Sequence, residues 1–348
     1  MNPYILAILL FGLGLGTTIT FASSHWLLAW MGLEMNTLAI LPLMAQYHHP
    51  RAVEATTKYF LTQATAAAML LFASTTNAWL TGQWEIQQMT HPLPTTIIIL
   101  ALALKIGLAP LHAWLPEVLQ GLDLTTGLVL STWQKLAPFA LLLQINPVNP
   151  TILIVLGLAS TLIGGWGGLN QTQLRKILAY SSIAHLGWMI LILQFSPSLT
   201  LLALLTYLIM TFSMFLVFKL NNSTTLNTLA ISSTKTPVIT SLAPLILLSL
   251  GGLPPLTGFM PKWMILQELT KQDLASIAMI AALSALLSLY FYLRLAYAMT
   301  LTISPNNLTG TAPWRLSSTQ STTPLAIAIS TTLCLLPLTP AISTLLIF

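Results

Sequence analysis

Long, uninterrupted apolar runs are the feature that most restricts how this chain can fold. Stretches such as TIIILALALKIGLA and LTLLALLTYLIMTFSMFLVF lack the alternation of a membrane β-strand, so they predict helices. A helix that crosses the hydrocarbon core needs about 20 mostly apolar residues. Measured against that length, the chain predicts about eleven spans, near 3–22, 25–45, 58–80, 94–112, 124–145, 149–169, 176–195, 199–219, 238–256, 274–298 and 324–346.

The composition excludes a water-soluble globule. Only 5% of the 348 residues are charged and 55% are hydrophobic, whereas roughly a quarter of the residues in a soluble domain are charged. The 12 Lys and Arg residues do not gather into a basic stripe, so no nucleic-acid partner is expected. The longest polar connection, at about 300–323, is predicted to be a surface loop, which leaves no room for a soluble domain.

The positions of Lys and Arg predict the orientation. Loops after odd-numbered helices hold only Lys262 and Lys271. Loops after even-numbered helices hold or adjoin Arg51, Lys58, Arg175, Lys176, Lys219, Lys235, Arg294 and Arg315. Since basic loops stay on the cytoplasmic or matrix side, the N-terminus is predicted on that side and the C-terminus on the other. No basic, Ser-rich leader precedes the first span, so we expect that span to be kept in the mature protein.

Two segments with one Gly/Pro pattern predict an internal repeat. GLAPLHAWLP from Gly107 aligns without gaps with GLPPLTGFMP from Gly252. The first segment follows the fourth predicted helix and the second follows the ninth, so the repeat unit is five helices. Because five is odd, equivalent helices cross the membrane in opposite directions, and the repeat is inverted. Proline lacks an amide donor and clashes with the preceding turn, so each segment should break its helix, as in transporters. The break residues are Gly107, Pro110, Pro116, Gly252, Pro254, Pro255 and Pro261.

The predicted fold is therefore an all-α integral membrane protein of about 11 transmembrane helices. It consists of two inverted five-helix repeats, each with a Gly/Pro-broken helix, and one C-terminal helix. We expect a single transmembrane domain, with the first repeat over 1–147, the second over 148–298, and a loop and final helix over 299–348.

Three ionisable residues, Glu34, Lys105 and Lys135, lie deep inside predicted spans. A charge at the membrane centre costs about 2.5–3.5 kcal/mol on insertion scales, so such residues usually mark ion or proton paths or pair with one another. Desolvation disfavours the charged form of a lysine, whereas a nearby carboxylate such as Glu34 favours that form. Residues whose charge can be shifted in this way suit proton storage and transfer. Lys262 follows the break at Pro261, and for it an interfacial anchor is an equal alternative.

Histidines and cysteine give weaker signals. His112 stands in the first break and His185 in the segment YSSIAHLGW, where each is a candidate proton carrier or a packed histidine. Cys334 is the single cysteine, the carboxylates are dispersed, and neither an HExxH motif nor a Walker loop occurs. We therefore expect no metal, iron–sulfur cluster or nucleotide on this chain.

The segments LKIGLAPLHAWLPEVLQ, RKILAYSSIAHLGWM and GGLPPLTGFMPKW resemble the antiporter-like subunits of respiratory NADH:ubiquinone oxidoreductase, complex I, and the similarity runs essentially from end to end. The resemblance implies an antiporter-like, proton-translocating membrane-arm subunit. In the family pattern a glutamate pairs with the lysine of the first broken helix, which Glu34 and Lys105 match. Lys135 matches the central lysine and Lys262 the terminal lysine. Longer family members have fourteen helices, of which this chain lacks the first three.

The resemblance also implies a location and partners. We expect a multi-pass protein of the mitochondrial inner membrane, with its N-terminus in the matrix and its C-terminus in the intermembrane space. Its partners would be the other membrane-arm subunits, antiporter-like, small core and accessory, and lipids such as cardiolipin. NADH, FMN, iron–sulfur clusters and ubiquinone would be bound by other subunits, so this chain is the non-redox part of a translocase. A stand-alone cation/proton antiporter and a purely structural scaffold remain as alternatives.

Overall fold

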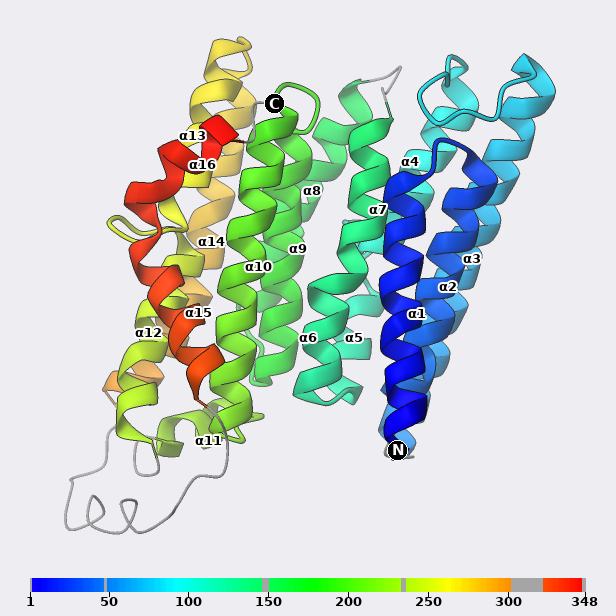
Figure 1. Ribbon diagram of the computed structural model, residues 1–348. Helices are drawn as coiled ribbons and strands as arrows, with labels where there is room; N and C mark the ends of the chain where they lie inside the picture. The colour runs from blue at the N-terminus through cyan, green and yellow to red at the C-terminus, as the bar shows by residue number, and fades with distance from the viewer. Residues whose placement is uncertain (1, 47–48, 146–149, 233–235, 302–321, 346–348) are drawn as a thin grey trace. The chain divides into compact units, whose positions relative to one another are not determined.

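The computed structural model describes residues 2–46, 49–145, 150–232, 236–301 and 322–345 (Figure 1). Within these ranges the chain is helical, and its only β pairings are two isolated bridges, His25 with Glu85 and Gln173 with Thr225. The predicted all-α class is confirmed. The chain divides into two compact units, Met1–Leu156 and Gly157–Phe348, which are described one at a time.

The first unit is built from helices that pack on their neighbours in the chain. Helix α1 packs on α2, α2 on α3, and α3 on both α4 and α5, while α7 contacts α1, α2, α4 and α6. Their bounds are α1 (Pro3–Ala22), α2 (Trp26–Met44), α3 (Pro50–Thr81), α4 (Pro92–Ile106), α5 (Trp114–Gly121), α6 (Leu124–Ser131), α7 (Trp133–Gln144) and the first part of α8 (Pro150–Gly168).

Capping residues set where these helices begin. The side chains of Asn2, His25 and His49 each accept a backbone N–H of the following first turn, at 3.3, 3.2 and 3.3 Å, which satisfies a donor that has no partner inside the helix. Pro50 occupies the first position of α3, where a missing N–H costs nothing. Helix α3 therefore starts well before the predicted span 58–80, because capping rather than hydropathy fixes its beginning.

Glycines allow α1 and α2 to cross closely. A Cβ on Gly16 would lie 2.8 Å from the carbonyl oxygen of Gly32, and a Cβ on Gly32 would lie 2.8 Å from that of Gly16. By contrast, a Cβ on Gly14 would have no atom within 4 Å. The Gly-rich run of α1 thus serves close helix packing on one face only.

An exposed ion-pair cluster ties the start of α3 to α5. Lys58 lies 2.7 Å from Glu54 and 2.8 Å from Glu117. The hydrogen bond from the Lys58 ammonium lowers the pKa of Glu54. Gly121 ends α5 so close to α3 that a Cβ there would lie 2.6 Å from the carbonyl oxygen of Arg51. The short helix after the first break is therefore held against α3.

The second unit is arranged around α10, α12 and α14. Helix α10 contacts α9, α12, α13, α15 and α16, while α14 packs on α9, α11, α12 and α13. The bounds are the rest of α8, then α9 (Leu174–Ile192), α10 (Pro197–Leu220), α11 (Leu226–Ile231), α12 (Pro237–Gly251), α13 (Phe259–Lys271), α14 (Ala275–Thr300), α15 (Thr323–Cys334), the 3-10 turn η4 (Leu336–Leu338) and α16 (Thr339–Leu345).

Several predicted spans are not single helices. The span predicted at 94–112 ends at Ile106, and the one at 124–145 divides into α6 and α7 at Thr132. The last span bends by 66° between α15 and the segment Leu336–Leu345, where Pro337 and Pro340 interrupt the apolar run. Helices α5 and α13 were not predicted. The predicted loop at 300–323 lies almost wholly outside the described residues.

The described helices make this a multi-pass membrane protein. Five of them, α1, α2, α8, α10 and α14, are long and apolar enough to cross a membrane unaided, and the bent pair at the C-terminal end would make six. Helices α4 and α12 are apolar but have only 15 residues each, or about 22 Å of helix. The count of eleven crossings stays a prediction.

Candidate proton-transfer site

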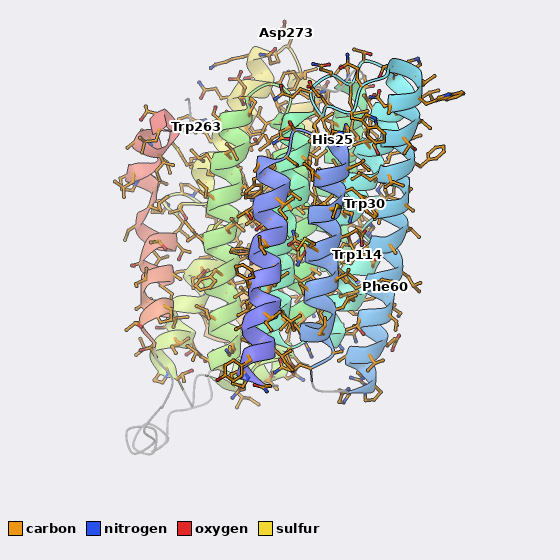
Figure 2. All side chains as sticks on the ribbon, turned by 45° about the vertical axis from the view of Figure 1, so that its right-hand side comes forward. His25, Trp30, Phe60, Trp114, Trp263 and Asp273 are labelled. Atoms are coloured by element: carbon orange, nitrogen blue, oxygen red, sulfur yellow. The ribbon has the colours of Figure 1, made fainter. Side chains whose placement is uncertain are left out.

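The first helix break lies at the end of α4. Gly107 adopts φ +86°, the left-handed conformation that glycine tolerates best. The backbone N–H groups of Gly107 and Leu108 both donate to the carbonyl oxygen of Ala103, each at 2.9 Å, which is the pattern of a glycine C-cap. The chain then runs through Pro110 and restarts as α5 at Trp114, which is labelled in Figure 2.

The second break, at the end of α12, has the same local geometry. Gly252 adopts φ +82°, and the N–H groups of Gly252 and Leu253 donate to the carbonyl oxygen of Leu248 at 3.1 and 3.2 Å. Both breaks also contain a cis peptide bond at the matching proline, Ala109–Pro110 in one and Pro254–Pro255 in the other. The predicted interruptions at Gly107 and Gly252 are therefore present in the structure.

The two breaks differ in what covers the last carbonyls of the broken helix. In the first, the indole Nε1 of Trp114 donates to the carbonyl oxygen of Leu104 at 3.0 Å, and the amide Nε2 of Gln63 donates to that of Lys105 at 3.4 Å. Neutral groups thus close the end of α4, which leaves the ammonium of Lys105 uninvolved.

In the second break a cation takes this place. The ammonium Nζ of Lys262 donates to the carbonyl oxygen of Gly251 at 2.8 Å and to that of Leu250 at 3.3 Å. The C-terminal end of a helix carries partial negative charge, so a cation there is stabilised. Lys262 thus caps the C-terminal end of α12 within its own unit.

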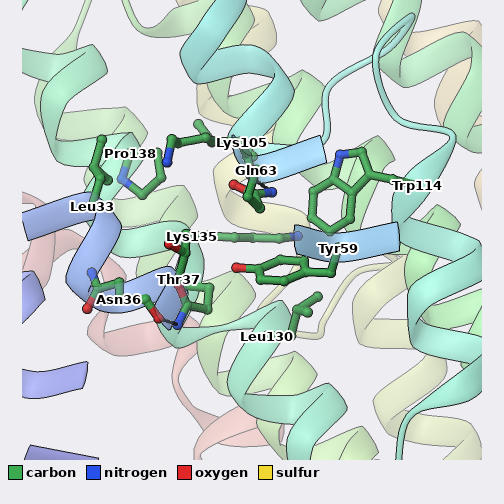
Figure 3. Close-up of a pocket in the computed structure, with 12 residues that line it drawn as sticks. Leu33, Asn36, Thr37, Tyr59, Gln63, Lys105, Trp114, Leu130, Lys135 and Pro138 are labelled. Atoms are coloured by element: carbon green, nitrogen blue, oxygen red, sulfur yellow. Dashed lines mark hydrogen bonds between the residues drawn. The ribbon is translucent and has the colours of Figure 1, made fainter. Parts of the chain in front are cut away.

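A small cavity in the first unit brings two of the predicted residues together (Figure 3). Lys105 and Lys135 both line it, and their side chains are only 5% and 3% exposed. The cavity volume is about 10 Å³, enough for about one water molecule. The other lining residues are Leu33, Asn36, Thr37, Tyr59, Gln63, Ile106, Trp114, Leu130, Gln134 and Pro138.

Lys135 owes its position to an irregular helix. Helix α6 ends at Ser131 and α7 begins at Trp133, so the backbone is interrupted just before Lys135. Pro138 lies inside α7, where it cannot donate a helical hydrogen bond to Gln134. Lys135 thus lies between a backbone interruption and a proline, and its side chain lines the cavity beside the end of α4.

Glu34 lies near Lys105 but does not line the cavity. It is half-buried on α2, where the hydroxyl of Thr37 donates to its carbonyl oxygen at 2.8 Å and to its Oε2 at 3.3 Å. Glu34 interacts electrostatically with Lys105, yet the Nζ of Lys105 has no hydrogen-bond partner among the described residues. The pairing implied by the resemblance is thus not a closed ion pair in this structure.

The two candidate histidines lie elsewhere. His112 is half-buried inside the first break, with Nδ1 3.2 Å from the carbonyl oxygen of Pro110, and it does not line the cavity. His185 belongs to α9 in the second unit, where Nε2 lies 3.5 Å from the hydroxyl of Tyr292. The described residues contain no group of three or more His, Cys, Asp or Glu side chains suited to a metal ion.

Several polar lining residues were not predicted from the sequence. Tyr59 and Gln63 are four residues apart on α3, so they lie on one face of that helix. Thr37 and Gln134 come from α2 and α7. The four-residue spacing of polar groups within KYFLTQAT is the one sequence signal that could have pointed to them.

Comparisons with known proteins identify the family of this chain. The family model described as NADH:quinone oxidoreductase/Mrp antiporter, TM, matches residues 23–288, and that described as NADH dehydrogenase subunit 2 C-terminus matches residues 289–343. The NADH-ubiquinone oxidoreductase chain 2 proteins of Tetraodon nigroviridis and Salmo salar are 79% and 74% identical to this chain, and each alignment covers 99% of both chains.

Solved structures show the same fold. A chain of respiratory complex I from Thermus thermophilus with bound aureothin is 28% identical, with a TM-score of 0.87 over 98% of this chain and 80% of that one. A chain of the Mrp complex from Dietzia sp. is 16% identical and shares the fold, with a TM-score of 0.78 over 95% of this chain and 74% of that one.

These matches also narrow the resemblance. The opening MNPY, the stretch KYFLTQATAAAMLLF and the length of 348 residues point to the mitochondrially encoded NADH dehydrogenase subunit 2 of vertebrates, and the fish relatives agree with this interpretation. The chain therefore belongs to the NADH-ubiquinone oxidoreductase chain 2 family, within the wider NADH:quinone oxidoreductase/Mrp antiporter family.

Proposed function

We propose that this chain is a core membrane-arm subunit of NADH:ubiquinone oxidoreductase that takes part in proton translocation. The observation that carries the proposal is the cavity shared by Lys105 and Lys135. Two amines in one nearly dry cavity repel each other when both are charged. One proton held between them can therefore be moved by a change in the charges around the cavity.

Glu34 supplies such a charge. Its carboxylate favours the ammonium form of Lys105, and a second ammonium on Lys135 opposes it. A movement that weakens the influence of Glu34 would release the Lys105 proton toward Lys135. Driving one charge against about 100 mV costs about 2.3 kcal/mol, so the energy must come from NADH oxidation and ubiquinone reduction in other subunits.

The two breaks support an inverted repeat within one antiporter-like domain. Matching left-handed glycines, at Gly107 and Gly252, end the helices that precede them. We place the first five-helix repeat at 1–147, the second at 148–298, and a loop with a final helix at 299–348, for about eleven crossings. In this arrangement Lys262 couples the path to its exit or to a neighbouring subunit, with His112 and His185 as further proton carriers.

The location follows from the family and the basic loops. We place the chain in the mitochondrial inner membrane, with its N-terminus in the matrix and its C-terminus in the intermembrane space. Its neighbours would be other membrane-arm subunits and lipids such as cardiolipin. FMN, the iron–sulfur clusters and the sites for NADH and ubiquinone would belong to other subunits.

Replacing Lys105 with methionine tests the proposal. The experiment uses the assembled oxidoreductase of a genetically tractable relative that carries the matching residue, reconstituted in liposomes. Lys105→Met should lower both the rate of ubiquinone reduction and the number of protons moved. Lys271→Met is the control, because Lys271 has a 61% exposed side chain at the end of α13 and should be neutral.

The two alternatives predict different results. Full pumping by an assembled complex in which Lys105, Lys135 and Lys262 are all neutralised would favour a structural scaffold. The insertion cost of these residues argues against that role, because a passive scaffold gains nothing from them. Ion exchange by the isolated chain in liposomes would favour a stand-alone antiporter.

A further inference from the structure

Two lysines cannot exchange a proton across a gap without a group between them that both accepts and donates. An ammonium group has three donors and no acceptor, and Nζ of Lys105 contacts no hydrogen-bond partner among the described residues. A hydroxyl group or a water molecule can accept one proton while it gives up another. The polar groups that line the cavity therefore decide how a proton passes from Lys105 to Lys135.

Most of those polar groups are already used. The side-chain amide of Asn36 has no hydrogen-bond partner among the described residues, but its oxygen lies against Gly16 of α1, away from the lysines (Figure 3). The other N–H and O–H donors of the lining, apart from the lysines and Tyr59, each bond a backbone carbonyl: Thr37 that of Glu34 at 2.8 Å, Gln63 that of Lys105 at 3.4 Å, Gln134 that of Asn36 at 3.3 Å, and Trp114 that of Leu104 at 3.0 Å.

Tyr59 differs both from these bonded donors and from Asn36. Its side chain is 2% exposed, and within the described ranges its hydroxyl makes no hydrogen bond to protein, although it lines the cavity. The ring is held by Trp114, with ring centroids 5.6 Å apart and planes at 60°. In Figure 3 the hydroxyl points into the pocket and away from Trp114. A rigid ring thus presents a free hydroxyl to the space that both lysines line.

We propose that Tyr59 relays protons between Lys105 and Lys135, directly or through the single water that the cavity can hold. This inference rests on the function proposed above. The ammonium of Lys105 gives one proton to the Tyr59 oxygen, or to the water bonded to it, as the phenolic proton passes to the neutral amine of Lys135. Lys105 ends as an amine, Lys135 as an ammonium, and Tyr59 as a neutral phenol.

The surroundings of Tyr59 suit a relay rather than proton storage. Glu34 interacts electrostatically with Tyr59 as well as with Lys105. A second negative charge in a buried site is costly, so the hydroxyl gives up its proton only as it receives another. A buried hydroxyl beside a carboxylate is therefore suited to passing a proton onward rather than to staying ionised.

Tyr59→Phe is the direct test, because it removes the hydroxyl and keeps the ring against Trp114. In the assembled complex we expect the rate of proton-coupled ubiquinone reduction to fall about tenfold or more, since a positioned proton-transfer group contributes about 10²–10⁴. The control is Tyr290→Phe, because Tyr290 lies on α14 with 61% exposure and should not change the rate.

Measuring Lys105→Met in the same assay distinguishes a failure of the Tyr59 relay from a failure of the proposed function. If Tyr59→Phe keeps the full rate and proton yield while Lys105→Met loses them, the relay is overturned and the proposed function stands. If both variants keep them, the proposed function itself fails.

Tyr59→His keeps the test decisive if Tyr59→Phe assembles poorly. Neutral imidazole has one donor and one acceptor nitrogen, so a relay predicts a faster rate per assembled complex for Tyr59→His than for Tyr59→Phe. Equal rates for the two variants would overturn the proposal, because they would show that only the shape of the side chain matters.

Discussion

Alanine at Gly252 should displace Lys262 from the end of α12. Gly252 has φ +82°, a left-handed conformation that costs other residues about 1–2 kcal/mol. A Cβ at this position would lie 2.8 Å from Cδ and 3.0 Å from Nζ of Lys262. The lysine would have to move, and its hydrogen bonds to the carbonyl oxygens of Gly251 and Leu250 would lengthen or break.

The expected loss of stability is the sum of a backbone cost and a contact cost. A hydrogen bond from a charged group contributes about 1.5–3 kcal/mol, so Gly252→Ala should cost about 2.5–5 kcal/mol if the shorter of the two bonds is lost. Gly82 is the matched control. It has φ +72°, but a Cβ there would meet no atom within 4 Å. Gly82→Ala should therefore cost only the free energy of the left-handed backbone conformation, about 1–2 kcal/mol.

Thermal inactivation of the assembled complex at one temperature measures the difference. Because about 1.4 kcal/mol corresponds to a tenfold change in rate, Gly252→Ala should inactivate at least about tenfold faster than Gly82→Ala. In a Lys262→Ala background, where both the Cδ and the ammonium that the new methyl group would meet are absent, Gly252→Ala should cost no more than Gly82→Ala. Equal inactivation rates for the two alanine variants in the otherwise native chain would contradict this expectation.

Two further predictions concern packing and the second break. Gly32→Ala places a methyl group 2.8 Å from the carbonyl oxygen of Gly16 and should cost about 1–3 kcal/mol, seen as less assembled complex on native gels. Gly14→Ala, whose added methyl group would meet no atom within 4 Å, should assemble normally. Equal yields of assembled complex for Gly32→Ala and Gly14→Ala would refute the packing argument. Thr257→Val removes a buried 2.7 Å hydrogen bond to the carbonyl oxygen of Thr332. The complex should lose about 1–3 kcal/mol of stability and inactivate faster on heating. An unchanged inactivation rate would show that this hydrogen bond does not stabilise the second break.

Helices could be predicted from the sequence more easily than their ends. The thickness of a bilayer fixes how long an apolar run must be, so the runs themselves identify most of the helices. Their ends depend on single hydrogen bonds, such as the one that the His49 side chain accepts at the start of α3. Hydropathy averages over many residues, so it placed the start of α3 too late.

The two helix breaks show what the sequence could predict and what it could not. The repeated GLxPL pattern predicted interruptions at Gly107 and Gly252, and both glycines end their helices as expected. The short helices that follow, α5 and α13, were missed because they have only 8 and 13 residues, fewer than the about 20 of a membrane span, and carry Glu117 and Lys262. Their helical state depends on packing against neighbours, such as α5 against α3, and no local pattern reports such contacts.

The residues of the candidate site also differ in how easily they can be predicted from the sequence. Lys105 and Lys135 stand out in the sequence because a charge inside an apolar run is rare, and the structure places both at one cavity. Tyr59 does not stand out, because an aromatic residue in an apolar helix usually serves packing. Its proposed role depends on the surroundings of its hydroxyl, which only the packing of α2, α3, α4 and α7 reveals.

The proton yield of a complex that lacks both cavity lysines would test the proposed role most directly. The measurement is the number of protons moved per NADH oxidised in liposomes, for Lys105→Met combined with Lys135→Met in a complex shown to be fully assembled. We expect the ratio and the coupled rate to fall together, because the cavity can then hold no mobile proton. A ratio equal to that of the native complex would show that protons cross the membrane without these two lysines.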